Sequence, residues 1–189
     1  MLKNNLSTLV SSTCVGCYNN NDLLSIVPSL IDKEGIPITT DPNKWNFDTP
    51  GYTDIYKKWQ DAKFNTNAIK WTNYYPGSHY SQQVVDNIAS HLNLNGVHRS
   101  WISRIDPGYY APWHWDVDDN EIEYLKKGHI VRYSIALSAP VMGHIFILGE
   151  DYLYKMSPGT IFKWKNYKEW HAGINAGMEP KFMFHIIGY

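Results

Sequence analysis

The stretch that decides the fold runs from residue 99 to residue 116 and reads RSWISRIDPGYYAPWHWD. Its first part, Arg99 to Ile105, predicts a β-strand, and Asp106-Pro107-Gly108 predicts the turn that ends it. After the turn, His114 and Asp116 lie two residues apart. In extended backbone, residues with this spacing point to the same face, so the imidazole and the carboxylate are expected to lie together.

Further strands are predicted from this stretch to the end of the chain. They are expected at Ile130–Leu137, His144–Leu148, Thr160–Trp164, Trp170–Ile174 and Lys181–Ile187. Turns that contain Pro or Gly separate several of them. Closely spaced strands with few helices favour a β-sandwich or a jelly-roll barrel, whose mouth can hold a small ligand.

The chain before residue 97 has a different pattern. Ser81 can cap a helix whose apolar side chains share one face, namely Val84, Val85, Ile88 and Leu92. Tyr52 to Ala62 is a second and weaker helix candidate, and the three prolines between Pro37 and Gly51 predict a loop. We therefore expect a single domain of 189 residues, in which a helical and loop region (1–96) supports a β-rich core (97–189).

Composition narrows the class of protein. Hydrophobic residues make up 43% of the chain and charged residues 19%, which is typical of an ordinary soluble globular protein. The net charge of −1 gives no polycationic surface for nucleic acid, and apolar runs such as Ile145–Leu148 are too short to span a bilayer. Residues 1–5 show no apolar segment of a secretory signal. We expect a cytoplasmic protein without nucleic-acid or membrane partners; the sequence does not indicate its oligomeric state.

The two cysteines, Cys14 and Cys17, have C-x-x-C spacing. A zinc site needs further ligands at suitable spacing, and the chain has no second C-x-x-C. The polar stretch that follows does not predict the helix of a thioredoxin-like unit. We expect two reduced thiols.

A third residue joins His114 and Asp116 as a candidate metal ligand. His171 lies on the penultimate predicted strand, and such a strand can meet the first two residues only once a barrel closes. Two imidazoles and one carboxylate are what a non-haem Fe(II) oxygenase uses to hold iron by one face, with three positions left open. Taken alone, however, an H-x-D sequence is as well explained by a surface or hydrogen-bonded pair.

Several motifs in fixed order surround these residues. They are Ser103–Gly108 before the first histidine, Arg132–Leu137 as a central strand, Pro158–Phe162 before Trp170-His171, and Lys181 ten positions after His171. Together they cover residues 101–189, and this part of the chain resembles the aspartyl/asparaginyl β-hydroxylase-like family of 2-oxoglutarate- and Fe(II)-dependent dioxygenases. The resemblance implies a double-stranded β-helix (jelly-roll or cupin-like) core as the catalytic unit.

The resemblance also implies residues for the co-substrate, 2-oxoglutarate. Ser103 matches a serine that binds its distal carboxylate, together with a basic residue that is usually arginine and is Lys181 here. Arg132 corresponds to an arginine beside the proximal carboxylate and keto group, and Ser134 stands where the family often has histidine. Lysine keeps the charge but loses the bidentate fork of arginine. The alternatives are a surface lysine on an edge strand and an ordinary strand-end arginine.

The implied reaction is hydroxylation of an unactivated C–H bond with Fe(II), 2-oxoglutarate and O2. The substrate would be an amino-acid residue in a protein or peptide, a free amino acid or another small molecule. An intact Asp116 favours hydroxylation over halogenation. Two alternatives stay open, namely a jelly-roll binding module with a vestigial metal site and a cupin-like metalloenzyme that does not use 2-oxoglutarate.

Other polar and aromatic residues are harder to assign from sequence. His185 shares a strand face with Lys181, so it could line the pocket or be a hydrogen-bonded core histidine. His129 and His144 are expected to be structural. Two further groups of residues can be interpreted either as ordinary loop or packing residues or as functional ones. They are an acidic run that could meet a cationic substrate group (Asp118, Asp119, Glu121, Glu123) and aromatic residues that could wall the entrance (Tyr109, Tyr110, Trp113, Trp115).

Overall fold

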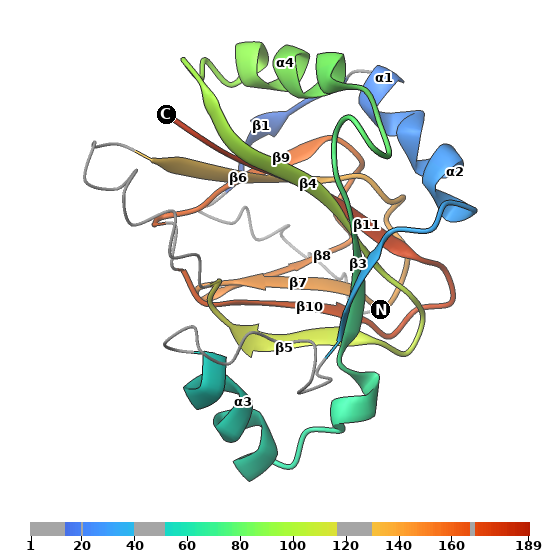
Figure 1. Cartoon of the computed structure of the whole chain (residues 1–189), viewed down its shortest axis with the longest axis vertical. Helices are drawn as coiled ribbons and strands as arrows, with labels where there is room; N and C mark the ends of the chain where they lie inside the picture. Colours follow the sequence, from blue (N-terminus) through green and yellow to red (C-terminus); the bar gives the residue numbers. More distant parts are fainter. Residues whose placement is uncertain (1–13, 20, 40–51, 117–129, 167–168) are drawn as a thin grey trace, which may run out of the picture.

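A computed structural model describes residues 14–19, 21–39, 52–116, 130–166 and 169–189. In this part of the chain, two antiparallel β-sheets face each other, and helices lie on the outside (Figure 1). We call them the major sheet, of seven strands, and the minor sheet, of four. None of the described helices is long and apolar enough to cross a membrane.

The major sheet has the strand order β1-β9-β6-β11-β4-β3-β2. Its strands are β1 (Cys14–Cys17), β2 (Ile36–Thr39), β3 (Lys70–Tyr74), β4 (Val97–Ile105), β6 (Val131–Ala136), β9 (Thr160–Lys163) and β11 (Lys181–Gly188). The minor sheet has the order β5-β10-β7-β8. Its strands are β5 (Tyr110–His114), β7 (His144–Leu148), β8 (Asp151–Tyr154) and β10 (His171–Asn175).

The eight strands from β4 to β11 form the double-stranded β-helix that the sequence predicts. Along the chain they pass between the sheets, so that β4, β6, β9 and β11 lie side by side in the major sheet and the other four make the minor sheet. The long strand β11 is central and pairs with β4 on one side and β6 on the other. The prediction of a mostly β chain with this core is confirmed.

Strand β11 contributes side chains both to the hydrophobic core and to the space between the two sheets. All eight of its residues are buried. Its even-numbered side chains belong to the hydrophobic core outside the sheet, whereas Lys181, Met183 and His185 line the space between the sheets. This alternation follows from the two-residue period of a strand, so one strand supplies both a packed core and a polar interior.

Helices cover the outer face of the major sheet. They are α1 (Asn21–Leu24), α2 (Ile26–Ile31) and α4 (Gln82–His91), all on one side of the molecule in Figure 1. The predicted cap holds, because the Ser81 side chain accepts a hydrogen bond from the backbone N–H of Gln83. Val85 and Ile88 of α4 pack in the same cluster as Phe184.

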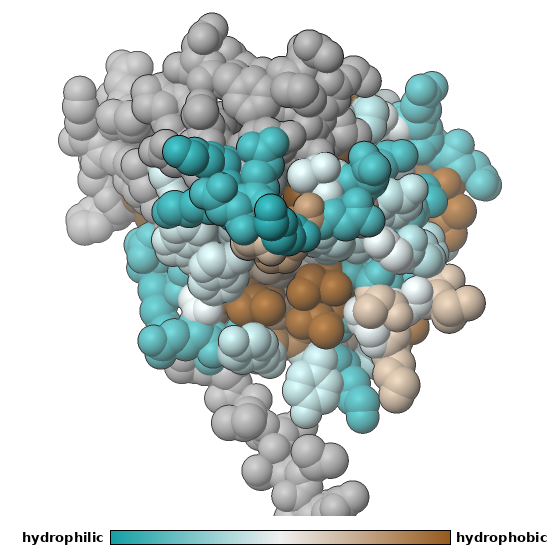
Figure 2. Space-filling model, turned by 90° about the horizontal axis from the view of Figure 1, so that it is seen from below, coloured by the Kyte–Doolittle hydropathy of each residue, from teal (hydrophilic) through white to brown (hydrophobic). Residues whose placement is uncertain are grey.

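The opposite side of the molecule is covered differently. Helix α3 (Tyr52–Asp61) lies beyond β5, as Figure 1 shows, and the short helix η1 (Thr66–Ala68) follows it. Figure 2 views this side from below and shows hydrophobic residues gathered near its centre. On the outward face of the minor sheet, the half-buried Ile147 pairs with the exposed Tyr152. This sheet face is thus less covered than the helix-packed face of the major sheet.

The N-terminal region differs from its prediction in one respect, because it contributes strands as well as helices. Strands β2 and β3 extend the major sheet beyond β4, and β1 pairs with β9 at the other edge. The expected loop from Pro37 to Gly51 begins with residues of β2, and residues 40–51 lie outside the described part. A proline fits there because β2 is at the edge of the described sheet, where one side of its backbone pairs with no other described strand.

Candidate metal centre and cavity

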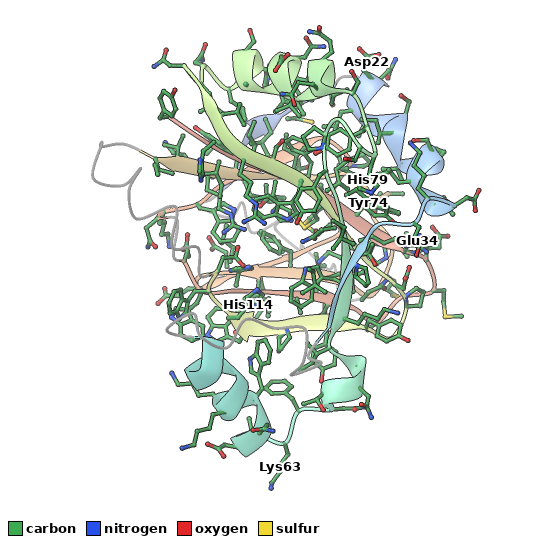
Figure 3. The ribbon with its side chains drawn as sticks, in the orientation of Figure 1. Asp22, Glu34, Lys63, Tyr74, His79 and His114 are labelled. Carbon is green, nitrogen blue, oxygen red and sulfur yellow. The ribbon has the colours of Figure 1, made fainter. Side chains whose placement is uncertain are left out.

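The three predicted ligands meet at one end of the interior. His114 ends β5 and His171 begins β10, and the two face each other in the register of the paired strands. Their ring centroids lie 4.2 Å apart. Asp116 follows two residues after β5, and its Oδ1 lies 3.5 Å from Nε2 of His114 and 3.8 Å from Nε2 of His171. Figure 3 labels His114 at β5, toward the space between the sheets.

Backbone carbonyls orient both imidazoles. Nδ1 of His114 lies 2.5 Å from the carbonyl oxygen of Pro112, and Nδ1 of His171 lies 3.1 Å from that of Glu169. A carbonyl only accepts, so each Nδ1 carries the proton and donates it. The lone pair of each Nε2 is therefore directed at the space beside Asp116. This is the arrangement in which outer partners fix metal-binding histidines.

Burial and nearby charges favour the metal-binding forms of two of the three groups. Burial lowers the pKa of His171 well below its usual value, and the nearby His114 and Arg132 lower it further, so the ring is neutral. Burial acts to raise the pKa of Asp116, but the Arg132 guanidinium, followed by the two histidines, holds it well below the ordinary value. A neutral imidazole and a carboxylate are the forms that bind a divalent metal.

Arg132 lies against Asp116. Its Nη1 is 2.6 Å from Oδ2 of Asp116, while Oδ1 faces the histidines. The contact is an ion pair rather than an aligned hydrogen bond, because Nη1 and Nε have no hydrogen-bond partner among the described residues. The guanidinium is held between two indoles, 3.6 Å from the ring centroid of Trp164 and 5.1 Å from that of Trp101. The family resemblance implied that Arg132 lies beside the co-substrate. In the structure its contact is an ion pair with Asp116, a predicted metal ligand.

A cavity of about 180 Å³ begins at these ligands and lies between the sheets. Lys181 also lines it, and the Cβ position of Gly173 is 3.6 Å from the Lys181 Nζ. Gly173 lies two residues along β10 from His171, which is about 7 Å of strand. The cavity therefore has a candidate metal centre at one end, and the amine of Lys181 lies beside a position about 7 Å along β10 from His171.

Lys181 is a buried cation without an acidic partner in the described part of the chain. Its side chain is 3% exposed. Nζ donates to the carbonyl oxygen of Ile145 and lies 5.5 Å from the ring centroid of Phe146. Burial lowers the pKa of Lys181 from 10.5 to about 7. A buried ammonium is costly unless an anion accompanies it, so this amine is suited to receive a carboxylate.

The two predicted serines contact His185 rather than open space. Nε1 of Trp164 donates to Oγ of Ser134 over 2.9 Å, and that Oγ lies 2.9 Å from Nδ1 of His185. Nε2 of His185 lies 3.0 Å from Oγ of Ser103. Burial, followed by the charge of Arg132, lowers the pKa of His185 well below its usual value, so the ring is neutral. His185 is thus both a hydrogen-bonded core histidine and a residue of the cavity wall.

The N-terminal region supplies wall residues that carried no sequence motif. They are Ile38 on β2 and Trp71, Asn73 and Tyr75 on or beside β3. Trp71 stacks on His114, with ring centroids 5.9 Å apart. Asn73 is 7% exposed, and its buried Oδ1 has no hydrogen-bond partner in the described part of the chain. Only the pairing of β3 with β4 brings these side chains to the cavity.

Three of the predicted entrance aromatics, Tyr110, Trp113 and Trp115, pack against other hydrophobic side chains. Trp113 is 40% exposed and stacks on Trp170 at 6.0 Å, and its carbonyl accepts a hydrogen bond from Trp59 Nε1. Trp115 packs in the cluster of Trp59 and Ile69.

Some of the remaining polar candidates lie in the described part of the chain and others do not. His144 Nε2 lies 2.9 Å from the carbonyl oxygen of Glu179, in line with a structural role. Both cysteines are free. His129 and the acidic run at 118–123 lie outside the described residues.

No family model matches the chain. No curated protein matches it either. Among solved structures, the viral collagen prolyl hydroxylase vCPH from Paramecium Bursaria Chlorella virus-1, solved as a 2OG complex, is 18% identical, with 71% of this chain and 87% of that chain covered and a TM-score of 0.43. A prolyl-4-hydroxylase from Pseudomonas putida is 14% identical, with coverages of 88% and 98% and a TM-score of 0.41. A predicted oxalate decarboxylase from Thermotoga maritima is 11% identical, with coverages of 63% and 80% and a TM-score of 0.39. The likeness is too distant to assign an activity.

Proposed function

We propose that the protein is an Fe(II)- and 2-oxoglutarate-dependent dioxygenase that hydroxylates a C–H bond. One observation carries the proposal, namely that a two-histidine, one-carboxylate cluster shares a small cavity with a buried cation that has no described acidic partner. The order of motifs across residues 101–189 supports a relation to the aspartyl/asparaginyl β-hydroxylase-like family within this class.

The donor set fits a divalent metal. His114, Asp116 and His171 each offer one ligand atom, and these atoms lie within 4.8 Å of one another. Arg132 engages Oδ2 of Asp116, so Oδ1 is left for a one-oxygen bond to the metal. Three protein ligands on one face leave positions for a co-substrate and O2, which is typical of non-haem Fe(II) oxygenases.

Lys181 fits the distal carboxylate of 2-oxoglutarate. The amine is buried and sits about 7 Å along β10 from His171, counted as two strand residues. A Cβ at Gly173 would lie 2.8 Å from Cδ1 of Ile105 and 3.6 Å from the amine, so the glycine lets both side chains approach β10 closely. In the proposed complex, Ser103, which lines the same cavity as Lys181, adds a hydroxyl for the carboxylate, while Ser134 acts on the site through His185.

The chain's own residues would position and shield the reactants. When bound, iron and 2-oxoglutarate would supply O2 activation and the oxidising power for hydroxylation. Phe146 and Met183 line the cavity with apolar surface that excludes water around Lys181. Trp71 and Trp164 pack against the two metal-binding imidazoles and fix their planes.

An anaerobic titration tests the proposal. Addition of Fe(II) and then 2-oxoglutarate should produce a charge-transfer band in the visible region, and aerobic incubation should release succinate. His114→Ala and Asp116→Ala should abolish both signals. Lys181→Ala should leave Fe(II) binding intact and weaken 2-oxoglutarate binding, whereas Lys163→Ala, which removes an exposed amine from β9, should change neither.

The outcomes separate the alternatives. Metal binding without a charge-transfer band or succinate would point to a cupin-like metalloenzyme that does not use 2-oxoglutarate. Absence of metal binding would leave the jelly-roll binding module. Either result would reject the proposed function.

A further inference from the structure

The wall that the cavity shares with β3 and β4 carries polar groups that neither the metal nor the co-substrate uses. Arg99 lies at the exposed end of this wall, on the face of β4 that also presents Trp101. Asn73 lies further in, opposite Ser103 in the pairing of β3 with β4. Both side chains line the same cavity as the metal-binding cluster.

We infer that the primary substrate is a small molecule with a free carboxylate, such as a free amino acid, which Arg99 binds through that carboxylate while Asn73 holds a second polar group. This inference rests on the proposed function, because it assigns Lys181 to 2-oxoglutarate. It adds the chemical class of the molecule that is oxidised.

The charge of the cavity supports an anionic substrate. Among the described residues that line it, three carry permanent or titratable positive charge besides histidine, namely Arg99, Arg132 and Lys181, and one carries a carboxylate, Asp116. The carboxylate pairs with Arg132. Among these described residues the cations outnumber the carboxylate, which favours an anionic ligand.

Arg99 is placed to meet that anion near the reacting centre. Its Cζ lies 5.0 Å from the ring centroid of Trp101, and the Cζ of Arg132 lies 5.1 Å from the same centroid. Arg132 in turn contacts Asp116, so a carboxylate on Arg99 would be held one indole away from the metal-binding cluster. A guanidinium binds a carboxylate through two parallel hydrogen bonds, which fixes the direction of the bound molecule.

Asn73 gives an independent indication of a polar ligand. Asn73 is only 7% exposed, and its buried Oδ1 has no hydrogen-bond partner among the described residues. An unsatisfied buried carbonyl oxygen costs free energy, which a ligand that donates to it recovers. An amide oxygen can accept from an ammonium, so it suits the amino group of an amino acid.

The dimensions favour a small molecule over a protein segment. The cavity volume of about 180 Å³ is below the ~300–1,000 Å³ of typical sites for drug-sized ligands. Trp71 and Ile38 from the N-terminal strands stand over the cavity beside His114. A wall made by two additional strands encloses a free molecule more readily than it admits a continuous peptide.

The test measures binding rather than turnover. Saturation-transfer NMR is recorded on the Lys181→Ala protein, in which the lysine cannot account for carboxylate binding, with Zn²⁺ in place of iron. Three panels are compared: the twenty free L-amino acids, their primary carboxamides, and tripeptides blocked at both ends. We expect signals from at least one free amino acid and none from its carboxamide.

Variants then locate the contact. Arg99→Gln should raise the dissociation constant of the amino acid about 10- to 100-fold, which is the range expected for the loss of a charge-assisted hydrogen bond. Asn73→Ala should raise this dissociation constant by a smaller factor. Lys163→Gln removes a cation from the outside of the same sheet and should leave binding unchanged. Thermal melts check that each variant is folded.

Equal binding of acids and carboxamides, an unchanged affinity in Arg99→Gln, binding of blocked peptides alone, or no binding at all would each overturn the inference. Because these measurements need neither 2-oxoglutarate nor catalysis, they are independent of the charge-transfer titration. A protein that binds 2-oxoglutarate but no free carboxylate at Arg99 would retain the proposed function and lose this inference.

Discussion

The buried amine of Lys181 should couple 2-oxoglutarate binding to proton uptake. Burial lowers the pKa of Lys181 from 10.5 to about 7 in the ligand-free protein. A carboxylate beside the amine favours the ammonium form and raises the pKa again. Near neutral pH, the bound complex therefore holds a proton that part of the free protein lacks.

The size of the effect follows from the free-state pKa. At pH 8 about nine-tenths of the amines are neutral, so binding should take up about 0.9 proton, falling to about 0.5 at pH 7 and about 0.1 at pH 6. Above pH 7 the apparent dissociation constant should rise about tenfold for each pH unit. Full recovery of the ordinary pKa corresponds to roughly 5 kcal/mol, which is an upper limit on what the pairing contributes.

The same shift affects stability without ligand, with a defined sign. Between the folded pKa of about 7 and the unfolded value of 10.5, the unfolded chain binds more protons at Lys181 than the folded one. The contribution of this residue to the free energy of unfolding should therefore rise with pH across that window. Lys181→Met, which removes the buried charge, should be most stabilising below pH 7.

Calorimetry can measure the uptake. 2-Oxoglutarate is titrated anaerobically into the Fe(II) protein at pH 8 in phosphate and in Tris, whose ionisation enthalpies differ, so the difference in observed heat gives the number of protons. Lys181→Arg is the matched control, because a guanidinium stays charged throughout this range. The reasoning is refuted if the wild-type protein takes up no proton, or if Lys181→Arg takes up as many.

Three further changes test separate parts of the site and the fold. Arg132→Met should release Oδ2 of Asp116 and weaken Fe(II) binding about 10- to 100-fold in competition with a chelator, as loss of an outer-shell partner does; an unchanged affinity would mean that Asp116 needs no support. Gly173→Ala places a methyl 2.8 Å from Cδ1 of Ile105 and 3.6 Å from the Lys181 amine. Because the Ile105 side chain must then shift within the cavity, 2-oxoglutarate binding should weaken by about tenfold or more, ~1.4 kcal/mol, without a change in Fe(II) affinity. Ser81→Ala removes the cap of α4 and should lower the free energy of unfolding by about 1 kcal/mol in urea denaturation, with no effect on either ligand.

The C-terminal strands could be predicted because their signals are local. Each combines β-branched or aromatic residues with a turn sequence, and the expected strand His144–Leu148 has the bounds of β7. Strand β8 was not predicted. It has four residues at the edge of the minor sheet, and Leu153 is the one buried among them. So short and exposed a strand carries little hydrophobic pattern.

The grouping of the three candidate metal ligands could be predicted for a related reason. His114 and Asp116 share a motif, and the order of strands brings His171 to them once the barrel closes. The partner of Arg132 could not be predicted, because a long side chain from one strand position reaches either the cavity or the carboxylate. The contacts with Trp101 on β4 and with Trp164 just after β9 decide between the two.

The cavity wall made by the N-terminal strands lay beyond prediction because its role depends on non-local pairing. Nothing in the sequence around Trp71 and Asn73 points to a ligand; their place follows from the pairing of β3 with β4. None of the three candidate metal ligands comes from this region. The metal centre and the wall can therefore be changed separately, and substitutions at Asn73 should alter which molecule binds while the affinity for Fe(II) stays constant.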